Sequence, residues 1–171
     1  PLMTKLATEF MPPLDEQSIL FMPVTLPNIS NEEIKRILQV QDKVIKSIPE
    51  VDKVLGKAGR ASTSTDNAPL SMIETIIMLK PKSEWRAGLS KKDIINELDA
   101  KLQIPGVVNG WTQPIINRIN MLATGIRTDV GVKVYGQDLD SIHALAEKIK
   151  ISLAGIDGIK ALYVHPITRG K

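Results

Sequence analysis

The order in which short apolar segments alternate with segments of helical periodicity limits this chain to few folds. Short apolar runs bounded by turn-forming residues are typical of strands, whereas apolar residues three or four apart indicate helices. Ser30, with Glu33 three residues later, predicts the start of one helix, which Pro49 ends, and Ser90 predicts the start of a second. Strands are expected at 18–26, 51–55 and 72–79, and residues 104–107 are expected to open a short strand or extended segment. The resulting order β-α-β-β-α-β predicts an α+β fold of the ferredoxin-like kind.

A second unit of the same kind begins near residue 129 and stops early. Val132 and Val134 indicate a strand, Asp138 can cap the helix that follows, and a further strand is expected at 159–164. A two-stranded sheet under one helix leaves an apolar edge and face uncovered, so we expect its other half to come from outside this chain. The sequence predicts a lead-in over 1–17, a first subdomain over 18–128 and an incomplete βαβ unit over 129–171.

The composition excludes several classes of function. The net charge is only +3, and the basic residues are mixed with acidic ones, which argues against nucleic-acid binding. The chain has no cysteine, so thiolate metal sites and cysteine nucleophiles are excluded. No apolar run approaches the roughly 20 residues needed to span a bilayer. Because the chain opens on Pro1 rather than on a methionine, we expect it to be part of a longer protein.

The motifs of enzyme chemistry are missing from the sequence. It shows no pairing of a nucleophile with a base and no metal-hydrolase motif. The loop at 56–59 (GKAG) resembles a phosphate-binding loop only in part, because the lysine is not followed by Ser or Thr. We therefore expect neither enzymatic activity nor a prosthetic cofactor. The fold alone leaves a structural interaction module open as an alternative.

Methionine is the residue type that suggests a ligand. The chain has six methionines, and a thioether is a soft, neutral donor that favours Cu(I) and Ag(I) over Zn(II). A single methionine is more often a flexible core filler, and Met78 is expected to be one. Met72 differs, because on a strand it shares a face with Glu74, and an unpaired carboxylate is costly in a sealed core. That pattern favours a cleft that water and ions can reach.

Long runs of the sequence resemble one transporter family. The runs are 9–27 (EFMPPLDEQSILFMPVTLP), 48–77 (IPEVDKVLGKAGRASTSTDNAPLSMIETII), 94–99 (IINELD) and 114–136 (PIINRINMLATGIRTDVGVKVYG). They occur in order and resemble the heavy-metal efflux branch of the resistance-nodulation-division transporters, its copper and silver exporters most closely. The resemblance implies a proton-driven homotrimeric pump in the Gram-negative inner membrane, with porter subdomains in the periplasm. It also implies a periplasmic adaptor protein, an outer-membrane channel, and membrane helices that lie outside this chain.

The same resemblance implies a metal site. In this sequence the three methionines of the family's site correspond to Met22, Met72 and Met121. The transported ligand would then be Cu(I) or Ag(I), bound by sulfur donors without the release of protons. A pump for Zn(II), Co(II) or Ni(II), with carboxylate and histidine ligands, is the alternative within the same branch.

Four charged residues correspond to positions along the family's metal path. They are Asp66, Glu74, Arg118 and Arg127. Arg127 stands where the copper and silver relatives commonly carry lysine, which keeps the charge and changes its geometry and hydration. An ordinary salt bridge of Arg118 with Asp66 or Glu74 is an equally good interpretation, because structural ion pairs look the same in sequence.

Overall fold

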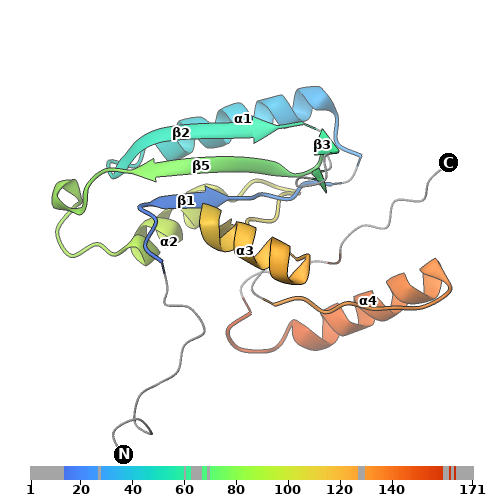
Figure 1. The fold of residues 1–171 in the computed structure, drawn as a ribbon. Helices are drawn as coiled ribbons and strands as arrows, with labels where there is room; N and C mark the ends of the chain where they lie inside the picture. Colours follow the sequence, from blue (N-terminus) through green and yellow to red (C-terminus); the bar gives the residue numbers. More distant parts are fainter. Residues whose placement is uncertain are drawn as a thin grey trace, which may run out of the picture.

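A four-stranded antiparallel sheet forms the centre of the molecule (Figure 1). The computed structural model describes residues 14–26, 28–59, 61–62, 67–68, 70–126, 130–159, 162 and 164. The strands are β1 (Ser18–Phe21), β2 (Val51–Ala58), β5 (Ile73–Leu79) and β6 (Trp111–Thr112), in the spatial order β2-β5-β1-β6. Helix α1 (Asn31–Lys46) joins β1 to β2, and α2 (Lys91–Lys101) lies between β5 and β6 in the chain. The predicted ferredoxin-like α+β fold is confirmed.

Both helices begin where the sequence predicts. At α1 the hydroxyl oxygen of Ser30 accepts a hydrogen bond from the backbone N–H of Glu33 (3.1 Å), and the Glu33 carboxylate pairs with Arg36 (2.6 Å). At α2 the capping box is complete, because Ser90 and Asp93 each accept a hydrogen bond from the other's backbone N–H. These side chains satisfy N–H groups that have no partner inside the helix.

The core lies between the sheet and these two helices. Side chains alternate along a strand, so Ile73, Ile77 and Leu79 of β5 turn toward the helices and are buried. On β1 the ring of Phe21 stacks on Trp111 of β6, with ring centroids 4.3 Å apart. The helices contribute the buried side chains Ile34, Ile37, Ile45, Ile94 and Leu98.

Two further helices follow the sheet. Helix α3 (Pro114–Thr124) contacts β1 from the face opposite α1 and α2 (Figure 1). Helix α4 (Leu139–Leu153) begins as predicted at Asp138, whose carboxylate accepts a hydrogen bond from the N–H of Ser141 (2.8 Å). Helix α4 contains no buried residue. Helix α3 was not predicted, although a proline in its first turn and a glycine directly after its last residue are signals for a helix.

Two predicted strands differ in the structure. Residues 104–107 form a turn instead of a strand, because Gly106 adopts a φ of 77° and the N–H of Val107 donates to the carbonyl of Ile104 (3.1 Å). The fourth strand is β6, several residues later. The segment 132–135 makes no strand pairing within 130–159, and Val132 and Tyr135 are exposed. Half of the strand expected at 159–164, namely residues 160, 161 and 163, lies outside the described residues.

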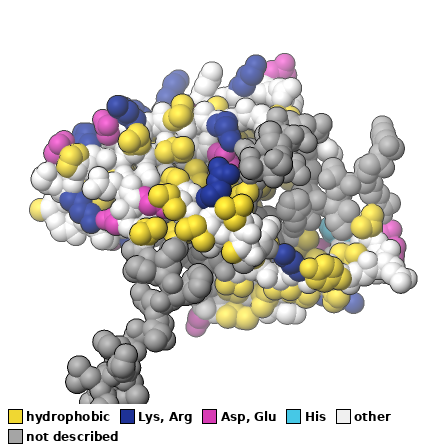
Figure 2. Space-filling model, in the orientation of Figure 1, with side chains coloured by type: hydrophobic (Ala, Val, Ile, Leu, Met, Phe, Trp, Pro, Cys, Tyr) yellow, Lys and Arg dark blue, Asp and Glu magenta, His cyan; other side chains and the backbone are white. Residues whose placement is uncertain are grey.

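Between residues 55 and 72, where the sequence predicts no strand, β2 continues to Ala58 and a small hairpin follows. The hairpin pairs β3 (Ala61–Ser62) with β4 (Asn67–Ala68). A 3-10 turn, η2 (Lys82–Glu84), follows β5. On the sheet face that α1 and α2 do not cover, Leu55, Ile76 and Met78 are 69%, 38% and 49% exposed. Figure 2 shows hydrophobic side chains gathered over this face.

Met78 was expected to fill the core, and that prediction is wrong. It stands between the buried residues Ile77 and Leu79, so the alternation of side chains along β5 turns it to the opposite face. The apolar neighbours in the sequence therefore belong to two different surfaces. The alternation of side chains along β5, and not the apolar run in the sequence, therefore sets the face on which Met78 lies.

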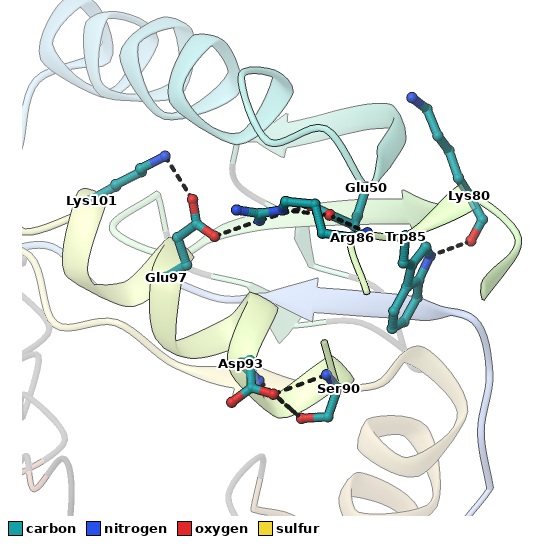
Figure 3. Close-up of polar contacts among 8 residues, drawn as sticks. All are labelled: Glu50, Lys80, Trp85, Arg86, Ser90, Asp93, Glu97 and Lys101. Atoms are coloured by element: carbon teal, nitrogen blue, oxygen red, sulfur yellow. Dashed lines mark hydrogen bonds and ion pairs between the residues drawn. The ribbon is translucent and has the colours of Figure 1, made fainter. Parts of the chain in front are cut away.

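An ion pair between Glu50, directly before β2, and Arg86 joins the start of β2 to the loop before α2 (Figure 3). Glu50 is fully buried, and its carboxylate accepts from Nε (2.7 Å), Nη2 (3.0 Å) and the backbone N–H (3.1 Å) of Arg86. Arg86 also donates to Glu97 (2.6 Å), which pairs with Lys101 (2.9 Å). The hydrogen bonds from Arg86 lower the pKa of Glu50 from its ordinary value of 4.5 to about 2.

This lowered pKa predicts a loss of stability in acid. Above pH 4.5 the carboxylate is ionised in both states and its full contribution is present; as pH falls toward about 2, the unfolded chain takes up the proton first and the contribution is lost. We expect Glu50→Gln to lower the free energy of unfolding at pH 7 by about 1–3 kcal/mol, because Arg86 is half exposed and solvent compensates in part. Urea unfolding from pH 7 to pH 2 measures this.

The matched control is Glu84→Gln, which changes an exposed carboxylate in the same loop. Its unfolding free energy should follow that of the unaltered chain at every pH. An acid dependence of stability that is the same in the Glu50→Gln variant would contradict the role assigned to the Glu50–Arg86 pair.

Candidate functional site

Met22 lies directly after β1, where the chain is held by close backbone contacts. Its N–H donates to the carbonyl oxygen of Gly110 (2.8 Å), and the Met22 side chain is only 6% exposed. A Cβ added to Gly110 would stand 2.9 Å from the carbonyl oxygen of Met22, closer than side chains approach a backbone oxygen. The glycine therefore allows the two segments to lie side by side, and this contact fixes the position of Met22.

Met72 lies directly before β5 and packs in the same small cluster as Met22. Val24 forms an isolated antiparallel bridge with Met72, which aligns the segment after β1 with the segment before β5. Leu20, Met22 and Met72 are buried together, and Val24 packs against them. The structure therefore brings two of the three predicted ligands into one apolar cluster on the α3 side of the sheet.

Met121, the third predicted ligand, lies on helix α3 and is not part of the cluster that holds Met22 and Met72. It lies in the last turn of α3, where its carbonyl oxygen accepts the N–H of Gly125 (2.9 Å), whose φ of 70° ends the helix. The side chain is half-buried and is not among the residues packed against the Leu20–Met22–Met72 cluster. Because α3 contacts β1, Met121 is carried on the helix that covers this side of the sheet.

Asn117 is a residue of this region that the sequence analysis missed. It precedes Met121 by four residues, so the two share a face of α3. The Asn117 side chain is 6% exposed, and no donor within the described part of the chain reaches its Oδ1. A buried amide oxygen without a donor is costly. The sequence signal that could have identified Asn117 is its spacing of four residues from Met121, which puts both residues on one face of a helix.

The charged residues predicted along the metal path are only partly within the described ranges. Glu74 and Lys57 are cross-strand partners on β5 and β2, and their side chains form an ion pair of 2.8 Å. Glu74 is 19% exposed and Lys57 is 59% exposed, so this pair lies at the edge of solvent. Arg118 is exposed on α3. Asp66 and Arg127 lie outside the described residues, so the structure does not place two of the four predicted charged positions.

The sharing of one face by Met72 and Glu74 agrees with the alternation along β5. Ile73 and Thr75 are fully buried under the helices, whereas Glu74 lies on the other face with partial exposure. Across the described ranges, no three His, Cys, Asp or Glu side chains gather as a metal ion would require. His143 is exposed, and His165 lies outside those ranges. The possible metal ligands that lie together in the described part of this region are the thioethers of Met22 and Met72.

None of the helices in the described ranges is long and apolar enough to cross a membrane. The chain matches the AcrB/AcrD/AcrF family over residues 1–169. It belongs to this family and, within it, to the heavy-metal efflux branch of the resistance-nodulation-division transporters.

Individual relatives give the extent of the similarity. The chain is 44% identical over 169 residues to the cation efflux system protein CusA of Escherichia coli K12, covering 99% of this chain and 16% of the relative. It is 38% identical to the nickel-cobalt-cadmium resistance protein NccA of Alcaligenes xylosoxydans, covering 98% of this chain and 16% of the relative. A solved heavy metal efflux pump matches with a TM-score of 0.81 and 31% identity, over 91% of this chain and 16% of that chain. The chain thus spans about a sixth of the length of these proteins.

The close contact at Gly110 gives a test of how Met22 is held. Gly110→Ala forces the backbone at Met22 to move, so we expect the free energy of unfolding to fall by about 1–3 kcal/mol. Gly155→Ala is the control, because an added Cβ there meets nothing within 4 Å. Urea unfolding of the two variants should separate them, and equal stability of both would show that the contact at Gly110 does not hold Met22.

Proposed function

We propose that this chain is part of the periplasmic porter of a proton-driven inner-membrane pump that exports Cu(I) or Ag(I). The ion would be bound by the thioether sulfurs of Met22, Met72 and Met121. The observation that carries the proposal is the burial of Met22 and Met72 in one cluster beside Leu20. Thioether sulfur is a soft donor, so such a cluster suits a soft monovalent ion better than a divalent one.

Ion binding requires the two buried thioethers to turn toward Met121. Methionine is unbranched and has three rotatable side-chain bonds, so its sulfur can leave an apolar contact at little cost in strain. Met121 is half-buried on α3 and needs no such release. In the proposed site the ion therefore draws Met22 and Met72 out of the cluster and toward the helix.

Neutral ligands also suit export. A methionine site gains and loses its ion without taking up or releasing protons, so the ion can leave without a change in ligand charge. Under this proposal the chain performs no enzymatic reaction and holds no prosthetic cofactor, and the metal ion is its cargo. The complete pump would be a homotrimer that works with a periplasmic adaptor protein and an outer-membrane channel, as other pumps of the branch are expected to do.

The second candidate is export of a divalent cation such as Ni(II), Co(II) or Zn(II). Two observations favour it: the 38% identity to the nickel-cobalt-cadmium resistance protein, and the position of the Glu74 carboxylate on the face that Met72 shares. Glu74 is already paired with Lys57, however, so it would have to exchange a cation partner for the metal.

Titration of the 171-residue chain with Ag(I) by calorimetry tests the proposal. We expect saturable binding of one ion per chain, which the combined variant Met22→Ala, Met72→Ala and Met121→Ala abolishes. Zn(II) should bind at least tenfold more weakly, on the order of 1.4 kcal/mol, because thioether ligands disfavour it.

Met78→Ala serves as the matched control, since Met78 is an exposed methionine on β5 and lies outside the proposed site. It should bind Ag(I) as the unaltered chain does. Equal Ag(I) binding by the triple variant, or a preference for Zn(II), would overturn the methionine site and favour the divalent cargo.

A further inference from the structure

Glu16, which precedes β1, caps the helix that carries Met121. One carboxylate oxygen accepts from the N–H groups of Ile115 (3.0 Å) and Ile116 (3.1 Å), and the other accepts from Ile115 as well (2.9 Å). Pro114 has no N–H, and the helix's own N-cap residue, Gln113, makes no side-chain cap. Glu16 therefore satisfies both N–H groups at the start of α3 that the helix leaves open.

The segment that holds Glu16 is itself tied down. The N–H of Glu16 donates to the side-chain oxygen of Gln113 (3.3 Å), which also accepts from Lys91 (3.0 Å). Asp15 pairs with Lys91 (2.7 Å) and with Lys82 (2.8 Å), and the pKa of Asp15 is held below its usual range by Lys82 first and then Lys91. Residues 15–16 thus join the start of α2 to the start of α3.

The backbone after Glu16 is strained. Gln17 has a φ of 51°, which within the described ranges is the one positive φ at a residue other than glycine. A side chain in this left-handed region costs about 1 kcal/mol or more, so the surrounding contacts must hold it there. The turn at Gln17 separates the helix cap at Glu16 from the first strand residue, Ser18, which pairs with Met78 of β5.

These contacts make one short segment the link between two of the proposed ligands, Met22 and Met121. Residues 16–22 hold α3 at one end, through Glu16, and carry Met22 at the other. We propose that Glu16 is a positioning residue for the metal site, because it fixes the height and rotation of α3 over β1 and thereby the position of Met121 relative to Met22 and Met72. This inference rests on the proposed metal-binding function.

The test compares Glu16→Gln with the unaltered chain by Ag(I) titration and by amide hydrogen exchange. Gln keeps the size and one acceptor oxygen but loses the charge that favours a helix N-terminus. We expect Ag(I) to bind roughly fivefold more weakly, and the α3 amides to exchange roughly fivefold faster, which is the usual scale of a lost cap. Amides of Ile77 and Leu79 in β5 should exchange as before, which shows that the fold is kept.

Two further variants make the result specific. Glu32→Gln changes an exposed acidic residue in the first turn of α1 and should leave Ag(I) binding unchanged. Glu16→Asp keeps the carboxylate on a side chain one methylene shorter and should restore part of the affinity.

The outcomes separate the two claims. If the unaltered chain binds no Ag(I), the proposed function fails and the positioning role fails with it. If it binds and Glu16→Gln binds equally well, the positioning role alone is overturned. The same holds when α3 exchanges faster while Ag(I) affinity stays unchanged, because Glu16 then stabilises the helix without setting the site.

Discussion

The antiparallel pairing of β1 with β5 is the constraint on which the rest of the structure depends. Its register, with Leu20 opposite Ile76 and Phe21 opposite Thr75, assigns every side chain of both strands to one of two faces. One face packs against α1 and α2 and forms the main core. The other face carries Leu20, Met22 and Met72 on the side of α3. A shift of the register by one residue would turn the proposed ligands toward α1 and α2 instead.

Much of this arrangement could be predicted from local sequence signals. Ser30, Ser90 and Asp138 each precede a helix that begins where expected, because a side-chain oxygen that caps a helix acts within three residues. The strand order followed from the alternation of strand and helix, which limits how the chain can return to the sheet. Local patterns were sufficient wherever the interaction that fixes an element lies within a few residues.

The predictions failed where the deciding contact is distant in the sequence. Strand β6 forms at Trp111 because that residue meets Phe21 of β1, about ninety residues earlier, and nothing near residue 104 shows that the pairing will be displaced. The missing strand at 132–135 has the right residue types and lacks a neighbour to pair with in the described ranges. The site divides in the same way: the strands place Met22 and Met72 together, whereas Met121 depends on a helix whose cap, Glu16, is about a hundred residues away.

The two environments of methionine in this chain differ although the side chain is the same. Met72, directly before β5, and Met78, within β5, lie six residues apart and turn to the same face of the sheet, yet Met72 is 8% exposed and Met78 is 49% exposed. The difference comes from what covers that face, since Met72 packs with Met22 and Leu20, whereas Met78 is exposed between the first residues of β1 and of β2. Burial alone would not mark a methionine as a ligand, and it is the proximity of a second thioether that distinguishes Met72.

The left-handed backbone at Gln17 limits which amino acids can replace it during evolution. Because the φ of 51° is imposed by contacts on both sides, the position selects residues by backbone shape and not by side-chain chemistry. Glycine would enter freely, and asparagine or aspartate at small cost. Valine, isoleucine, threonine and proline would be excluded, however well they suit the strand that follows. Variation among descendants of this chain should therefore be narrow at residue 17 even though its side chain is exposed.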